Sequence, residues 1–223
     1  MVGSFNTVNG QHEYRLNVFR TLKHQNGQGP KHRIEVPMKS QYKTIDHLSG
    51  LLCKAVERVL NACTQKQINY SPTIQSIPKI TMKPDVGCFV TLSGDYHGLL
   101  VMNFSGDAAM AIYKNYMLSM GLPENELSSH FTSNEVTDSI GEIVNQIMGE
   151  FMRLIAEEFF LVAFCGQPKV LALNSAITLT IDSDYRDNRR ISFSIDHDRF
   201  QVELALEQTE FITLPEKMEA GQP

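Results

Sequence analysis

The chain has 223 residues, a hydrophobic content of 42% and a formal net charge of -5. This composition is typical of a soluble globular protein with one large domain or two small ones. The negative charge argues against general binding to nucleic acids or anionic membranes, which requires a basic face. Since no apolar run approaches the roughly 20 residues of a membrane span, we expect the partners to be proteins or small molecules.

The cysteine pattern indicates free thiols. None of the four cysteines belongs to a C-x-x-C pair, and no secretory leader precedes them: Cys53, Cys63, Cys88 and Cys165. We therefore expect reduced, mostly buried thiols in a cytoplasmic protein, rather than disulfides or a metal site.

Residues 1–43 are polar and rich in Asn, Gln, Gly, His and Lys, so we interpret them as an N-terminal extension or arm. The histidines in this stretch are irregularly spaced, which favours solvated side chains over a metal site. The pattern changes at residue 44. We expect one folded domain over 44–212 and a flexible tail over 213–223.

The first part of this domain combines a helix with strands. Apolar residues recur at helical intervals over residues 44–64, which predicts a first core helix. Residues 71–104 are punctuated by Pro, Gly and Asp and predict strands, of which 86–92 and 98–104 form a hairpin. We interpret this hairpin as scaffold.

A second helix is predicted over 108–120, with Ser105 as its N-cap and Gly121 at its C-terminal end. The helix carries a stripe that is typical of core packing or of a subunit interface. The stripe consists of Met110, Tyr113, Tyr116, Met117 and Met120. We expect this helix to cover one face of the sheet.

Residues 132–160 predict a third, longer helix with one apolar and one polar side. The apolar side is formed by Ile140, Val144, Ile147, Phe151, Leu154 and Ile155. On the opposite side lies a row that we call the polar ridge: Asp138, Glu142, Asn145 and Gly149, at spacings of four, three and four residues. Thr132 and Glu135 fit a capping box, which predicts that the ridge lies inside a rigid helix.

Beyond residue 168 the sequence predicts an antiparallel meander of three strands, over 168–182, 189–196 and 200–210. Charged residues follow the first of these strands, and we interpret them as a solvated rim because they lack the glycine and ligand order of a calcium loop. They are Asp182, Asp184, Asp187, Arg189 and Arg190.

The spacing Asp138-x-x-x-Glu142-x-x-Asn145, followed by twenty-two residues and then Pro168, resembles the signature of the CheC/CheX/FliY family of chemotaxis phosphatases. The resemblance covers roughly residues 44–212. It implies an α/β (α+β) fold of the CheX type, with a mostly antiparallel sheet, long helices packed on it, and a homodimer.

In two-site members of this family the first helix carries its own E-x-x-N copy. Here the matching surface has no Glu/Asn pair and consists of Asp46, Gly50, Lys54 and Arg58. We therefore expect a single site, as in CheX.

The chemistry available on the polar ridge is limited to a carboxylate and a neutral amide. The sequence contains no phosphate-cradling glycine loop, nucleophile elbow or H-E-x-x-H motif. Asn145 takes no proton at neutral pH, although it can aim a water molecule by hydrogen bonds. The reaction must therefore be intrinsically easy, as the hydrolysis of an acyl phosphate is.

The resemblance implies that the substrate is the phospho-aspartate of a CheY-like response-regulator receiver. Asn145 would orient the attacking water and Glu142 would pair with a receiver cation. Asp138 would extend the docking edge, and Gly149 would allow close approach. The resemblance implies no cofactor in this chain, with a divalent metal such as Mg²⁺ expected on the receiver.

Two other interpretations remain open. A helix face with acids and amides is most often solvated surface without a function. The family also contains non-catalytic relatives, so the chain could instead bind a receiver or a flagellar-switch component without hydrolysing anything.

Overall fold

The structure, a computed structural model, divides into two compact units, Met1–Tyr42 and Lys43–Pro223. It describes residues 2–8, 11–17, 44–173, 177–178 and 187–207. In the first unit, β1 (Val2–Val8) and β2 (Gln11–Asn17) form an antiparallel hairpin. The predicted tail over 213–223 lies outside the described residues, as do Asp182, Asp184 and most of the predicted arm.

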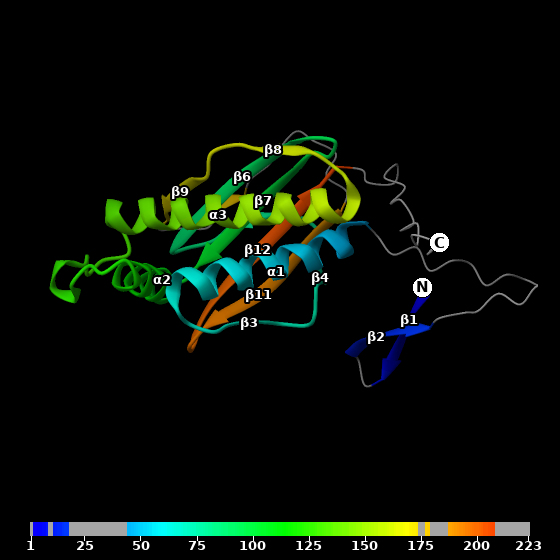
Figure 1. The fold of residues 1–223 in the computed structure, drawn as a ribbon, viewed down its shortest axis with the longest axis horizontal. Helices are drawn as coiled ribbons and strands as arrows, with labels where there is room; N and C mark the ends of the chain where they lie inside the picture. Colours follow the sequence, from blue (N-terminus) through cyan, green and yellow to red (C-terminus); the bar gives the residue numbers. More distant parts are fainter. Residues whose placement is uncertain (1, 9–10, 18–43, 174–176, 179–186, 208–223) are drawn as a thin grey trace, which may run out of the picture. The chain divides into compact units, whose positions relative to one another are not determined.

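The second unit is built on an eight-stranded sheet in which every described pairing is antiparallel (Figure 1). The strand order is β3-β11-β12-β7-β6-β8, with β4 beside β11 and β9 beside β6. The strands are β3 (Ile68–Tyr70), β4 (Gln75–Ser76), β6 (Val86–Gly94), β7 (Gly98–Phe104), β8 (Ala163–Cys165), β9 (Lys169–Ala172), β11 (Asp187–Ile195) and β12 (Asp198–Leu206). The predicted hairpin is β6–β7, and all seven residues of β7 are buried.

Three long helices pack on one face of this sheet: α1 (Thr44–Thr64), α2 (Gly106–Ser119) and α3 (Asn134–Phe159). α1 and α3 run side by side over the strands (Figure 1). A short 3-10 helix, η1 (Glu124–Glu126), lies between α2 and α3. This arrangement confirms the predicted α/β (α+β) fold class, with long helices on a mostly antiparallel sheet.

The opposite face of the sheet is covered by a short second layer. Strands β5 (Thr81–Met82) and β10 (Ile177–Thr178) pair with each other, and Met82 packs there in a small apolar cluster. Glu203 of β12 is fully buried. Its carboxylate accepts hydrogen bonds from the Thr81 backbone N–H at 3.0 Å and from Arg190 Nε at 2.7 Å. A buried charge is stabilised by such paired hydrogen bonds.

The predicted three-strand meander is wrong, because residues 168–182 contain β9, which pairs with β6, and β10, which pairs with β5, so that within the described residues only β11 and β12 are neighbours. The structure also corrects two further sequence predictions. The first concerns the capping box, because α3 is capped by Ser133 and not by Thr132. The Ser133 Oγ accepts a hydrogen bond from the Val136 backbone N–H at 3.4 Å. The helix therefore begins one residue later than the capping box requires, and Glu135 is not at the capping-box position.

The second correction concerns the predicted solvated rim. Asp187 lies within β11 and not in a turn. Arg189 and Arg190 lie in the predicted strand, but their side chains are at most 21% exposed and do not form a solvated rim. Only 7% of the Arg189 side chain is exposed, and its Nε donates to Asp46 Oδ1 of α1 at 2.5 Å. The ion pair links α1 to the sheet, and sequence reasoning missed it because its partners are 143 residues apart.

All four cysteines are free, as predicted. Cys53 and Cys88 are buried, whereas Cys63 and Cys165 are half-buried. Burial raises the pKa of the Cys53 and Cys88 thiols to about 12, so both are protonated at neutral pH. None of the helices that the structure describes has the length and apolar character to span a membrane.

Candidate functional site

The polar ridge owes its position to the packing of α3. The helix buries a continuous apolar stripe against the sheet and α1, including Ile140, Val144, Ile147 and Phe151, each at most 1% exposed. These residues fix the rotation of α3 about its axis. The side opposite the stripe must then face solvent.

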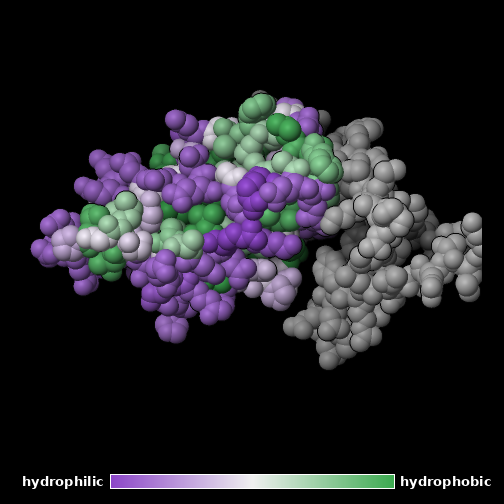
Figure 2. All heavy atoms as spheres, viewed as in Figure 1, coloured by the Kyte–Doolittle hydropathy of each residue, from purple (hydrophilic) through white to green (hydrophobic). Residues whose placement is uncertain are grey.

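All four ridge residues are exposed: Asp138, Glu142, Asn145 and Gly149. At 3.6 residues per turn they fall within an arc of about 60°, and Glu142 and Asn145 lie about 4.5 Å apart along the axis. Figure 2 shows hydrophilic side chains over the outward sides of α3 and of the neighbouring α1. The structure thus brings the predicted site residues together on one open helical face.

The Asn145 amide is available for a ligand. Its side chain makes no hydrogen bond with any residue in the described part of the chain. An exposed, unengaged carboxamide can donate to one group and accept from another, which is what holding a water molecule in a fixed direction requires.

Glu142 has a neighbour that sequence reasoning did not assign to the site. Tyr116 of α2 is 7% exposed, and its hydroxyl lies near the side chains of Glu142 and Gln146, where α2 contacts α3. Burial raises the pKa of Tyr116, and the Glu142 carboxylate raises it further. The sequence showed only a Met- and Tyr-rich stripe, and the stripe does not reveal which helix its members face.

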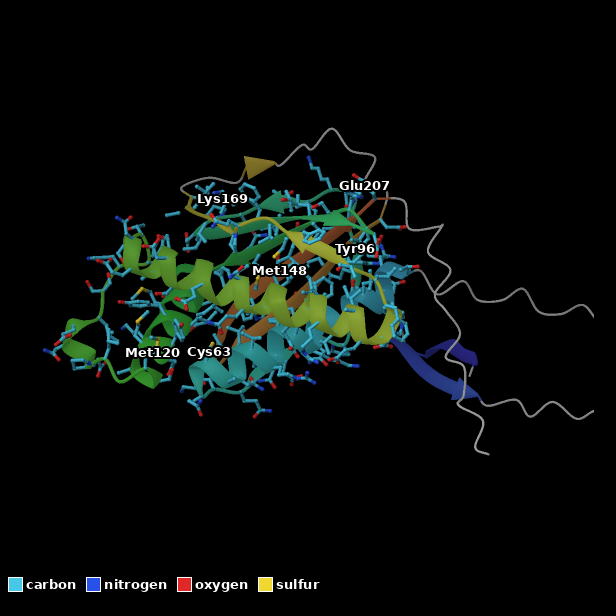
Figure 3. The ribbon with its side chains drawn as sticks, turned by 45° about the horizontal axis from the view of Figure 1, so that its top comes forward. Cys63, Tyr96, Met120, Met148, Lys169 and Glu207 are labelled. Carbon is cyan, nitrogen blue, oxygen red and sulfur yellow. The ribbon has the colours of Figure 1, made fainter. Side chains whose placement is uncertain are left out.

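The end of α2 is also tied to the end of α1. Ser119 Oγ donates to the Cys63 carbonyl oxygen at 2.7 Å, and Figure 3 shows Cys63 and Met120 near each other at the ends of the two helices. Since Tyr116 lies one turn before Met120, this junction also holds Tyr116 beside α3. The C-terminal ends of α1 and α2 thus support the half of α3 that carries Glu142.

Gly149 leaves an open position on the ridge. No atom lies within 4 Å of the point that a Cβ would occupy at this glycine. The chain's own packing therefore does not require glycine here, and the space above the helix backbone is free for another molecule.

Directly after this opening, Glu150 links α3 to α1. Its carboxylate accepts hydrogen bonds from Arg153 at 2.8 Å and from Arg58 Nη1 at 2.5 Å. These bonds, with Arg153 contributing most, lower the pKa of Glu150 to about 2. Arg153 also pairs with Glu157. Sequence reasoning missed this network, because a partner on α1 cannot be read from the spacing on α3.

Pro168 lies in the short connection between β8 and β9, which pair with successive parts of β6. Pro cannot continue a helix, and the chain runs on into β9, which contacts α3. A Cβ at Gly141 of α3 would meet Val170 Cγ2 of β9 at 3.4 Å. Pro168 thus precedes a strand that packs against α3, and it is not part of the helix that carries the polar ridge.

The α1 surface that lacks a Glu/Asn pair contains one acidic residue that is bound to the sheet and two exposed basic residues. Asp46 is engaged by Arg189, whereas Lys54 and Arg58 are exposed. Among the described residues, no group of three or more His, Cys, Asp or Glu side chains is placed to hold a metal ion.

A family model described as "Protein of unknown function (DUF3334)" matches residues 39–222. The chain belongs to this family. No curated protein matches the DUF3334 chain.

Solved structures identify the fold. CheX from Desulfovibrio desulfuricans is similar at 20% identity and a TM-score of 0.61, covering 72% of the DUF3334 chain and 99% of its own. CheX from Vibrio vulnificus gives 19% and 0.59, with 72% and 99% covered. The CheX of a CheX–CheY–BeF3–Mg²⁺ complex from Borrelia burgdorferi gives 17% and 0.52, with 72% and 98% covered. The DUF3334 chain has the CheX fold, as the ridge motif predicted.

Proposed function

We propose that this protein is a CheX-like phosphatase that hydrolyses the phospho-aspartate of a CheY-like receiver domain. The observation that carries the proposal is the pair of exposed side chains Glu142 and Asn145, one turn apart on a rigid helix of a CheX fold. The Borrelia burgdorferi CheX was solved together with CheY, BeF3 and Mg²⁺, which supports a receiver as the class of partner.

Hydrolysis of an acyl phosphate requires few catalytic groups from the enzyme. Water attacks the phosphorus, the bond between phosphorus and the aspartyl oxygen breaks, and the products are inorganic phosphate and the free carboxylate. Phosphoryl transfer depends mainly on alignment and charge neutralisation. Asn145 would align the water, while the receiver supplies its own divalent metal and the activated leaving group.

Docking would place the phosphoryl group over Asn145. Glu142 would pair with a cation of the receiver, and Tyr116 lies near its carboxylate. Asp138 would extend the same edge, and the open position at Gly149 would admit the receiver surface. We propose that this occurs in the cytoplasm.

A homodimer is also part of the proposal. Large apolar side chains are exposed near the β8 end of the sheet: Phe160, Val162, Phe164 and Leu171, from 43% to 81% exposed. β8 ends the path of hydrogen-bonded strands, and an open strand edge beside apolar side chains is a common pairing surface. We propose that a second copy covers them. Light scattering should then give a dimer mass for the wild type and a monomer mass for Phe164→Ser.

The phosphatase proposal is tested with receivers phosphorylated by acetyl phosphate, followed by loss of the label. Asn145→Ala should slow hydrolysis by about 10²-fold, the typical cost of a misplaced reactant, while binding to a beryllofluoride-loaded receiver is retained. Gln146→Ala is the control, because it removes a second exposed carboxamide from the next residue of α3, one that lies near Tyr116 and does not belong to the polar ridge.

Two outcomes would contradict the proposal. Full activity of Asn145→Ala would show that Asn145 does not orient the water. A wild-type protein that binds loaded receivers without shortening the lifetime of the phosphoryl group would be a receiver-binding protein and not a phosphatase.

A further inference from the structure

The basic residues of α1 stand out on a chain whose net charge is -5. Lys54 and Arg58 are one turn apart on α1, and both are exposed. Lys54 forms no ion pair with any residue that the structure describes. Helical residues four apart point the same way, so their positive charges face solvent together.

Arg58 is fixed beside the polar ridge. Its Nη1 donates to Glu150 of α3 at 2.5 Å, and the Glu150 side chain is only 15% exposed. The Arg58 side chain itself is 59% exposed. Within the described residues its Nε and Nη2 make no hydrogen bond, and a guanidinium has five N–H donors. Most of its donors are therefore free for another molecule.

Arg58 lies close enough to the polar ridge for one bound protein to contact both. Glu150 follows Asn145 by five residues, about 7.5 Å along the helix axis, and Lys54 lies about 6 Å beyond Arg58. A stable interface covers about 800 Å² on each partner, a patch with a radius of about 16 Å. A protein centred on Asn145 would thus cover Arg58 and reach Lys54 at its rim.

We propose that Lys54 and Arg58 form a docking contact for acidic side chains of the receiver that binds at the polar ridge. This inference rests on the proposed function and extends it. The docking face then has an acidic part and a basic part. Asp138 and Glu142 would face cations of the receiver, and Lys54 and Arg58 would face its acidic side chains. A partner with this pattern of charges fits in one orientation only, and the surface without a Glu/Asn pair gains a role.

A contact at the rim predicts a specific kinetic signature. Rim charges change the association rate and its salt dependence more than the dissociation rate. At low ionic strength, Lys54→Gln with Arg58→Gln should slow association with a beryllofluoride-loaded receiver by about 3- to 10-fold. In 0.5 M salt, where the Debye length falls to a few ångströms, the difference from wild type should be nearly lost (~2-fold or less).

The matched control removes two positive charges from the opposite side of the sheet. Lys79 and Lys169 are exposed. Lys79 directly precedes Ile80 of the apolar cluster on that side, and Lys169 points away from the helices because the adjacent Val170 packs against the main core. Lys79→Gln with Lys169→Gln changes the net charge equally and should leave the association rate within about twofold of wild type.

The experiment is stopped-flow association of the full chain with the loaded receiver, at low and high salt, with melting temperatures for each variant. Slowing by the α1 double variant alone, removed by salt, supports the docking contact. Equal rates for both double variants, slowing that persists in high salt, or no binding by the wild type would overturn it. The phosphatase proposal fails separately, through the hydrolysis rates of Asn145→Ala and Gln146→Ala.

Discussion

Gly149 allows one substitution to separate stability from function. No atom lies within 4 Å of an added Cβ at this position, and the residue lies in the interior of α3. Replacing glycine by alanine in a helix interior stabilises the helix by about 1 kcal/mol. In a folded unit of this size, that gain corresponds to a rise in Tm of about 2–4 °C.

The same methyl group is expected to impair the proposed reaction. Gly149 lies one turn beyond Asn145 on the polar ridge, where the receiver would approach most closely. A displacement of about 1 Å can cost up to ~10²-fold in rate. Because the receiver can partly adjust to a single methyl group, we expect Gly149→Ala to lower kcat/KM by about tenfold while it melts at a higher temperature.

The assay combines thermal unfolding with dephosphorylation of a CheY-like receiver. Gly50→Ala is the control, because Gly50 also lies inside a helix with no atom within 4 Å of an added Cβ. It should raise Tm by a similar amount and keep its activity, so a loss caused by helix stiffening would appear in both variants. Equal activity of the two variants would refute close approach at Gly149. A lower Tm for Gly149→Ala would show that an added methyl group does not fit at this position.

Three further predictions concern stability. Glu203→Ala should cost about 3 kcal/mol in urea unfolding, because it leaves Arg190 without its carboxylate partner; a loss below about 1 kcal/mol would contradict the ion pair's importance. The lowered pKa of Glu150 means that its bonds to Arg153 stabilise the fold above about pH 4.5 and that this contribution is lost as the pH falls toward 2. The Tm difference between wild type and Glu150→Gln should therefore shrink over that range, and a constant difference would argue against it. Ser105→Ala removes the N-cap of α2 and should cost about 1 kcal/mol, whereas Ser105→Asp should retain most of the stability.

Several elements could be predicted from the sequence because their signals are local. The apolar periodicity over residues 44–64 corresponds to α1, and Ser105 caps α2 as expected. Gly121 has a φ of 88°, which glycine adopts at little cost after a helix. The capping box failed for a local reason as well, since Thr132 and Ser133 are both good caps and the spacing to Glu135 favoured the wrong one.

Other features depend on residues far apart in the chain. A charged stretch such as Asp187–Arg190 resembles a solvated turn when only neighbouring residues are considered. Arg189 is buried because Asp46 of α1 accepts its hydrogen bond, and Arg190 lies in the sheet because Glu203 faces it from β12. In the same way, Tyr116 belongs beside Glu142 only because α2 packs against α3.

The sequence by itself determined the order of elements and the composition of the polar ridge, because helical periodicity fixes which side chains share a face. It also indicated the CheX fold through the spacing from Asp138 to Pro168. Only the tertiary structure decided that the ridge is exposed, that Gly149 is open, and that Arg58 stands beside it. These properties depend on which surfaces the helices bury against one another and on the sheet, and one helix's periodicity carries no information about its neighbours.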